Sequence, residues 1–328
     1  MKYKLLLVSV LVLTTLASIS QGLGRFSTSG VSTNHWAMVV LFWSGVLDSP
    51  STSADRTTFG APQTVAAAAS TDISTDSQEE FSWQGRLQAG QTIEIKGVNG
   101  HVRAEGYGGN QVEVVASKKG RRSDPKAVEM RVVEHAGGVT ICAVYPSADA
   151  SRPNDCQPGS GGHINVNNND VEVDFTVRVP AGVRFSGRTV NGGVEATGIA
   201  SNVEAVTVNG SININASGMA EATTVNGSIK AVIGSANWSN EARFTTVNGS
   251  ITLDFPAGLS TEVRAETLNG DVTSDFPMSP QGAQNDERRP GVPKRVLATI
   301  GGGGGGRTLV LKTINGNIRL RRGPERAL

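Results

Sequence analysis

Seven charged residues in the second half of the chain are the side chains best suited to chemistry. The acidic ones are Glu195, Asp254, Glu266, Asp271 and Asp275. Arg243 and Arg264 recur 21 residues apart, as do the Asp-Phe-Pro tripeptides that begin at Asp254 and Asp275. Two carboxylates beside a Lys or Arg can cleave a glycosidic bond, with one as acid and the other as base or nucleophile. The pattern therefore offers one enzymatic hypothesis, a polysaccharide-cleaving site along Asp254, Asp271 and Asp275.

The same residues also fit a simpler interpretation as surface ion pairs. If Arg243 lies beside Asp254 and Arg264 beside Asp275 on neighbouring strands, each pair contributes roughly a few tenths of a kcal/mol to stability. Such pairs need no substrate. We favour this interpretation and expect no enzymatic activity, with a carbohydrate-active enzyme as the alternative.

Cofactors and metals have no recognisable ligand set. The four histidines, His35, His101, His135 and His163, show no metal-ligand spacing with one another or with cysteine. The glycine run Gly301–Gly306 lacks the Lys-Ser/Thr end of a phosphate-binding loop. A net charge of +1 favours neither nucleic acid nor a strongly acidic partner. We therefore expect no cofactor, no metal and no nucleic acid.

Two cysteines, Cys142 and Cys156, lie 14 residues apart, the first on an expected strand and the second in a polar loop. In an exported chain we expect them to form a disulfide that closes this loop, a constraint worth about 3 kcal/mol.

The elements that would position all these residues are set by a repeat. A Thr-Val-Asn-Gly motif, or a close variant, occurs seven times, and the steps from Asn191 to Asn269 are 18, 17, 22 and 21 residues. The seven Asn-Gly pairs are Asn99-Gly100, Asn191-Gly192, Asn209-Gly210, Asn226-Gly227, Asn248-Gly249, Asn269-Gly270 and Asn315-Gly316. A turn that recurs about every 20 residues is typical of a repeat architecture and not of a catalytic pocket.

Apolar residues alternate with polar ones on both sides of each Asn-Gly pair. In the fifth copy the apolar series is Ala242, Phe244, Thr246, Ile251, Leu253 and Phe255. Period-two alternation predicts two half-buried strands per copy, so we expect an all-β protein, with glycine supplying a positive φ at the corner.

Two all-β architectures fit this pattern. In a β-solenoid, each copy is a two-strand rung of about 20 residues and its strands lie parallel to those of the next rung. In an antiparallel β-meander, each Asn-Gly is a hairpin turn. We favour the solenoid, because parallel stacking brings identical Thr and Asn side chains into line, where they can hydrogen-bond.

The segments outside the repeat suggest an export signal and a linker. Lys2 and Lys4 precede an uncharged run, which predicts a signal peptide and favours cleavage over an uncleaved anchor because the run is short. An apolar segment, 36–47, has no assigned role. The predicted organisation is a signal peptide (1–21), a Ser/Thr/Ala-rich tether (22–79), an N-terminal β region (80–180) with a polar loop (147–169), and a repeat array (181–322) with an insertion (278–306).

The T-[VIL]-N-G-x-[IV] copies resemble the bacterial "putative adhesin" β-repeat family, exported proteins whose domain has no assigned function. The Phe175–Pro180 segment ahead of the array and the Gly-rich run before the last copy carry the same resemblance, which covers about residues 80–322. It implies surface adhesion and brings no catalytic residues.

We therefore expect a non-enzymatic exported module of the cell envelope, in the periplasm or at the cell surface, that binds a polysaccharide, lipid or protein. An envelope-stress sensor or scaffold is a further alternative. The expected binding face consists of Arg243, Thr245, Thr252 and Arg264. Neither the ligand nor the oligomeric state follows from the sequence.

Overall fold

The computed structural model describes residues 77–149, 151–235, 238, 241–281, 292–302 and 307–323. These residues form two β-sheets, and their one helical element is a short 3-10 turn, Pro125–Ala127. The predicted signal peptide and segment 36–47 lie outside the described residues. Strand β1 begins at Ser77 and so includes the last residues of the predicted tether. No helix in the described part of the chain is long and apolar enough to span a membrane.

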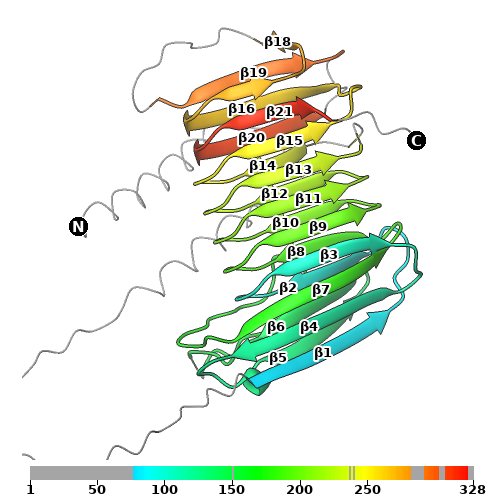
Figure 1. Cartoon of the computed structure of the whole chain (residues 1–328), viewed down its shortest axis with the longest axis vertical. Coiled ribbons are helices and arrows are strands. Elements are labelled where there is room, and N and C mark those ends of the chain that lie inside the picture. The colour runs from blue at the N-terminus through cyan, green and yellow to red at the C-terminus, as the bar shows by residue number, and fades with distance from the viewer. Residues whose placement is uncertain are drawn as a thin grey trace, which may run out of the picture. The chain divides into compact units, whose positions relative to one another are not determined.

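Both sheets are built mainly from parallel strands contributed by successive repeats (Figure 1). Sheet A contains, in spatial order, β1 (Ser77–Gly85), β4 (Val112–Gly120), β7 (Glu172–Pro180), β3 (Val102–Tyr107), β9 (Val194–Ile199), β11 (Ile212–Ala216), β13 (Ile229–Ile233), β15 (Ile251–Phe255), β21 (Ile318–Arg322) and β17 (Val272–Ser274). Sheet B contains β18 (Met278–Pro280), β19 (Lys294–Ile300), β16 (Thr261–Asn269), β20 (Thr308–Asn315), β14 (Glu241–Thr245), β12 (Ala220–Thr223), β10 (Val203–Val206), β8 (Arg184–Arg188), β2 (Thr92–Lys96), β6 (Gly138–Val144) and β5 (Glu129–His135).

Each repeat is one rung of a solenoid. Its first strand lies in sheet B, the chain turns at Asn-Gly, and its second strand lies in sheet A. The strands of neighbouring rungs pair in parallel; for example, Ile212 of β11 lies beside Ile229 of β13. The solenoid prediction is confirmed, and the alternative of Asn-Gly hairpins is wrong because the two strands that flank each corner belong to different sheets.

The order of rungs in space differs from their order in the chain. Strand β14 pairs with β20, and β20 pairs with β16. The last copy is therefore inserted between the fifth and the sixth. The expectation that the Asp254 and Asp275 rungs are direct neighbours is wrong, because the rung of β20 and β21 lies between them.

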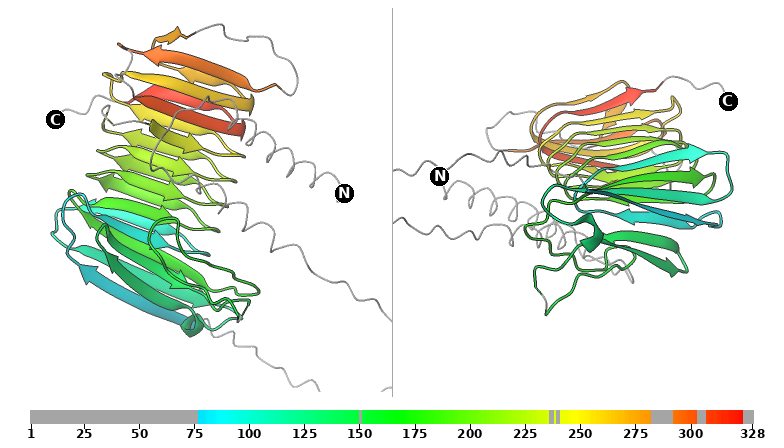
Figure 2. Two further views of the ribbon diagram at one scale, coloured as in Figure 1. Left: turned by 180° about the vertical axis from the view of Figure 1, so that it is seen from behind. Right: turned by 60° about the horizontal axis from the view of Figure 1, so that its bottom comes forward.

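Antiparallel strands lie beyond the parallel rungs at both ends of the stack (Figure 2). Strands β4 and β1 extend sheet A, and β5 extends sheet B. At the other end β19 pairs antiparallel with β16, and β18 pairs with β19. The segment 278–306, which the sequence suggested was only an inserted loop, thus supplies two strands that cover the edge of the last rung. Covered edges prevent uncontrolled strand pairing with other chains.

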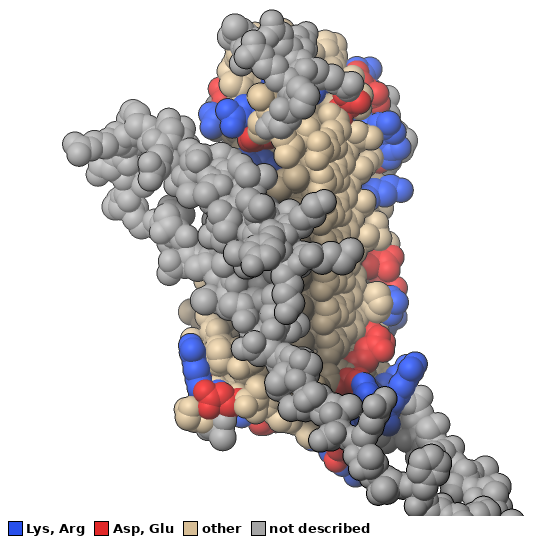
Figure 3. Space-filling model, turned by 90° about the vertical axis from the view of Figure 1, so that its left-hand side faces the viewer, with Lys and Arg blue, Asp and Glu red and all other residues tan. Residues whose placement is uncertain are grey.

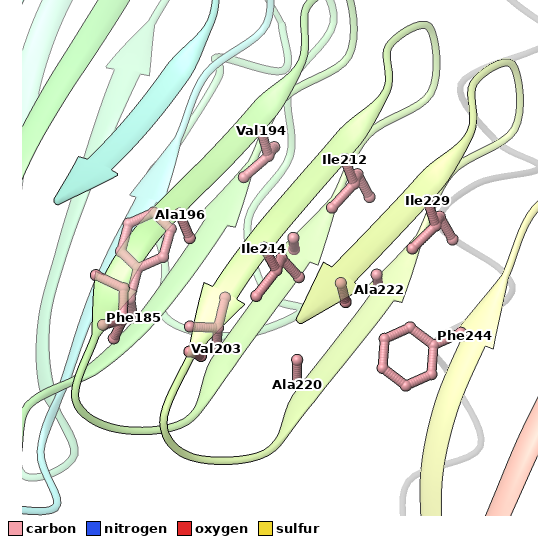
Figure 4. Close-up of a cluster of buried hydrophobic side chains, with 14 of the residues drawn as sticks. Phe185, Val194, Ala196, Val203, Ile212, Ile214, Ala220, Ala222, Ile229 and Phe244 are labelled. Atoms are coloured by element: carbon pink, nitrogen blue, oxygen red, sulfur yellow. The ribbon is translucent and has the colours of Figure 1, made fainter. Parts of the chain in front are cut away.

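The core lies between the two sheets and follows the alternation in the sequence. In β11, Ile212, Ile214 and Ala216 are buried while Asn213 is exposed. Figure 4 shows Val194, Ile212 and Ile229 in one row, with alanines of sheet B such as Ala220 directed into the same interior. Repetition of these small and branched residues lets each rung pack on the next in one orientation.

Candidate binding surface at the Asn-Gly corners

The seven corner asparagines form a continuous ladder of side-chain hydrogen bonds. The Nδ2 of each Asn donates to the Oδ1 of the Asn in the adjacent rung, at 2.7–2.8 Å. In spatial order the ladder is Asn99, Asn191, Asn209, Asn226, Asn248, Asn315 and Asn269. At its first end, Asn99 Nδ2 contacts the carbonyl oxygens of Asn169 and Val171, both at 3.4 Å. The surface of this side is therefore a fixed row of amides.

The corner glycines are required by the close approach of neighbouring rungs. A Cβ built on Gly192, Gly210, Gly227, Gly249, Gly270 or Gly316 would lie 1.9–2.0 Å from the carbonyl oxygen of the adjacent corner glycine. The expectation of a positive φ at every corner is wrong, because among the seven only Gly100 and Gly192 have φ in that range. The neighbouring backbone, not the local conformation, excludes a side chain at most corners.

The threonine of each motif points inward and bonds to the same glycine carbonyl. Six Thr Oγ1 atoms donate to it at 2.7–3.0 Å. They belong to Thr189, Thr207, Thr224, Thr246, Thr313 and Thr267, all buried. Each rung is thus tied to the next by an exposed amide bond and a buried hydroxyl bond, which explains why Thr and Asn recur together.

Removing one ladder side chain tests how much these bonds contribute. We expect Asn226→Ala to lower the free energy of unfolding by about 1–2 kcal/mol, because Asn226 donates to Asn209 and accepts from Asn248. The measurement is urea denaturation. The control is Asn213→Ala, an exposed strand residue whose amide has no partner among the described residues; its cost should stay within about 0.5 kcal/mol. Equal effects of the two changes would contradict a stabilising ladder.

A second row of hydrogen bonds runs beside the asparagines, at the residue after each corner glycine. The side chain in one rung accepts from the backbone N–H of the next, at 2.9–3.3 Å. The pairs are His101 Nδ1 with Gly193 N, Ser211 Oγ with Ser228 N, Ser228 Oγ with Ser250 N, Ser250 Oγ with Asn317 N, and Asn317 Oδ1 with Asp271 N. The row is interrupted at Gly193, which has no side chain to offer.

A groove of about 500 Å³ opens at this interruption. Its functional side chains come from three rungs: His101 and Arg103, Glu195, and Asn209, Ser211 and Asn213. The Nε of Arg103 lies 3.8 Å from a carboxylate oxygen of Glu195, and both side chains are about half exposed. The groove therefore combines amides, a hydroxyl, an imidazole and one neutralised ion pair.

The rest of the corner side carries few charges. Figure 3 shows this side, and where its described residues are visible a band of uncharged residues runs along the stack, with Lys, Arg, Asp and Glu at its margins. The band contains the asparagine row and the half-buried aliphatic residue that precedes each Asn, such as Val208 and Val225. A ligand on this side meets amides, hydroxyls and aliphatic groups.

The four residues predicted as a binding face do not lie together. Arg243, Thr245 and Arg264 belong to sheet B, on β14 and β16, whereas Thr252 belongs to β15 of sheet A. Thr245 is also buried. Arg243 pairs with Glu241, two residues away on its own strand, and Arg264 Nη2 lies 3.6 Å from Glu262. The predicted pairing of these arginines with Asp254 and Asp275 is wrong, because a corner places each arginine and its proposed partner on different sheets.

The five carboxylates considered for catalysis each have a different basic partner. Asp254 forms two hydrogen bonds with Arg321, at 2.6 and 2.7 Å, and this raises the pKa of the guanidinium. The other contacts are Asp275 with Arg322 N, Asp271 with Lys294, Glu266 with Arg295 and Glu195 with Arg103. No group of three or more possible metal ligands occurs in the described ranges. The carboxylates act as separate ion pairs there.

The cysteines hold a loop over the outer face of sheet B. Cys142 of β6 and Cys156 form a disulfide, with 5.8 Å between their Cα atoms. Beside it, Lys96 Nζ donates to the carbonyl oxygens of Gln157, Gly159 and Gly161, at 2.5, 2.6 and 3.1 Å. Burial lowers the pKa of Lys96, and the neighbouring Glu94 opposes that shift. The alternating charges of β2 looked like a solvent-exposed face in the sequence, so this buried cluster had no sequence signal.

Comparisons with known proteins agree with the repeat. Residues 162–321 match the family model of the Toastrack domain, DUF4097. No curated protein matches the chain. A crystal structure of a "putative cell adhesion protein" from Clostridium sporogenes is similar over 75% of this chain and 100% of that chain, with 11% identity and a TM-score of 0.40. A "putative adhesin" from Bacteroides fragilis is similar over 75% of this chain and 98% of that one, with 11% identity and a TM-score of 0.23.

The matched residues begin in the disulfide-bound loop and end in β21, so they contain every parallel rung except the first, formed by β2 and β3. The resemblance to the "putative adhesin" β-repeat family is confirmed, and over residues 162–321 the chain belongs to the Toastrack DUF4097 family.

Proposed function

We propose that the protein is a non-enzymatic exported module that binds a component of the cell envelope through the Asn-Gly corner side. The observation that carries this proposal is the unbroken asparagine ladder, because it fixes exposed hydrogen-bonding groups at the strand spacing of about 4.8 Å over seven rungs. A preorganised array loses little conformational entropy when it binds a repeating ligand.

Two further features support a location outside the cytoplasm. The N-terminal sequence is typical of an export signal. The Cys142–Cys156 disulfide is the kind of bond that persists in oxidising compartments. Binding at the envelope is therefore compatible with the chemistry of the chain.

The test is retention of the purified full-length protein on cell-wall, polysaccharide and lipid fractions. We expect retention at micromolar concentration, and its absence on every fraction would overturn the proposal. We also expect Ser228→Asp to weaken retention about tenfold, because it places a charge in the uncharged band while its carboxylate can still accept from Ser250 N–H. Thr223→Asp puts the same charge on sheet B and should leave retention unchanged. Stronger loss with the sheet B variant would assign binding to the other face.

A further inference from the structure

The interruption at Gly193 leaves one backbone donor without an acceptor. In the adjacent rungs the N–H after the corner glycine bonds to a side chain of the preceding rung, such as Ser228 N to Ser211 Oγ. Because Gly193 has no side chain, Ser211 N–H donates to no atom in the part of the chain that the structure describes. This donor faces the groove. An oxygen atom from a ligand can occupy the position that a serine Oγ holds in the other rungs.

The groups around this donor can both give and accept hydrogen bonds. His101 Nδ1 accepts from Gly193 N at 3.0 Å, so the other ring nitrogen carries the proton and is a donor. The Asn213 amide, exposed beside the groove, offers a donor and an acceptor and has no partner within the described residues. Arg103 and Glu195 add a charged donor and acceptor, and each neutralises the other.

These groups select against two ligand classes. A free anion gains little, because Glu195 lies beside the one cationic side chain of the groove. An apolar ligand would leave Ser211 N–H and the Asn213 amide without partners when it displaced water. Neighbouring hydroxyl groups on a rigid ring satisfy the whole set, since each hydroxyl can accept from an N–H and donate to a carboxylate or amide oxygen.

We propose that the groove at Gly193 is a binding site for an uncharged saccharide, one of whose hydroxyl oxygens accepts from Ser211 N–H in place of the missing serine side chain. This inference rests on the proposed envelope-binding function and names the ligand class for one position of the corner side. The absence of a side chain at Gly193 is then a binding feature within a row that is otherwise filled.

The test uses the full-length protein with cellotetraose and chitotetraose as neutral saccharides and tetragalacturonate as a charged one. Binding is followed by calorimetry and by the amide resonance of Ser211. We expect the protein to bind a neutral tetrasaccharide with a shift of that resonance. Gly193→Ser, which supplies the missing Oγ, should weaken binding at least tenfold. A Cβ at Gly193 would lie 2.9 Å from Ser211 O, so Glu195→Gln, an exposed change with an expected fivefold loss, serves as the second variant.

The control is Ser250→Ala, which removes an acceptor from the same row outside the groove and should keep affinity within twofold. Unchanged affinity in both Gly193→Ser and Glu195→Gln would overturn the site, as would binding of tetragalacturonate alone. If the native protein is retained on envelope fractions but binds no neutral tetrasaccharide, the groove inference fails while the proposed function stands. If it is retained on nothing, both fail.

Discussion

Gly227→Ala is expected to destabilise the fold by about 3 kcal/mol or more, enough to prevent folding if the protein is marginally stable. The added Cβ would lie 1.9 Å from the carbonyl oxygen of Gly210, a backbone atom that no rotamer change can move. Relief would require the two rungs to separate. That would stretch the bond from Thr246 Oγ1 to Gly227 O and the ladder bond from Asn226 to Asn209. The measurement is urea denaturation followed by circular dichroism.

The matched control is Gly258→Ala in the same part of the chain. An added Cβ there has no atom within 4 Å, and the φ of Gly258 is not in the left-handed region. We expect a change within about 0.5 kcal/mol, with the sign set by the reduced entropy of the unfolded chain. If Gly227→Ala were as mild as this control, close approach of the rungs would not be the reason for glycine at the corners.

The parallel stacking could be predicted from the sequence because it leaves a record in the residues. Adjacent rungs place Asn beside Asn and Thr beside a glycine carbonyl, so the same residues are needed at every corner. The reason for glycine could not be predicted in the same way. Local sequence shows that a side chain is excluded, but a positive φ and a close neighbour exclude it equally, and only the position of the next rung separates the two causes.

The order of the last rungs had no sequence signal. Any corner can stack on any other, because all present the same Asn, Gly and Thr groups, so the insertion of β20 between β14 and β16 follows from tertiary contacts. Strand β19 pairs with β16 and completes this arrangement. Its segment follows a charged, Pro-rich stretch that suggested a loop.

The candidate site shows the same division. Gly193 is visible in the sequence as a departure from the Asn-Gly-Ser pattern, but the free Ser211 N–H becomes apparent only when the bonds of each rung are compared. The predicted binding face was wrong for a simple geometric reason. Alternation identifies the outward residues of a strand, whereas the corner between β14 and β15 decides that Arg243 and Thr252 face opposite directions.

Loss of the disulfide is the second large effect that we expect. Cys142→Ala/Cys156→Ala should lower the free energy of unfolding by about 3 kcal/mol, because the bond closes a loop with a sequence separation of 14 residues. The loop should also become sensitive to protease before the rest of the protein. Its other attachments to sheet B include the three bonds from Lys96 Nζ and the bond from Gly159 N to Glu94, at 2.9 Å.

Reducing agent provides the internal control for this prediction. It should destabilise the native protein by the same amount as the double variant and should have no effect on the variant itself. Opening of the loop would also return water to Lys96, so its pKa should rise from the value that burial lowers. Unchanged stability after complete reduction would show that Lys96, Glu94 and the adjoining loop contacts hold this segment without the covalent bond. The stability of the N-terminal end of the stack would then depend on that buried charge cluster and not on the redox state of the compartment.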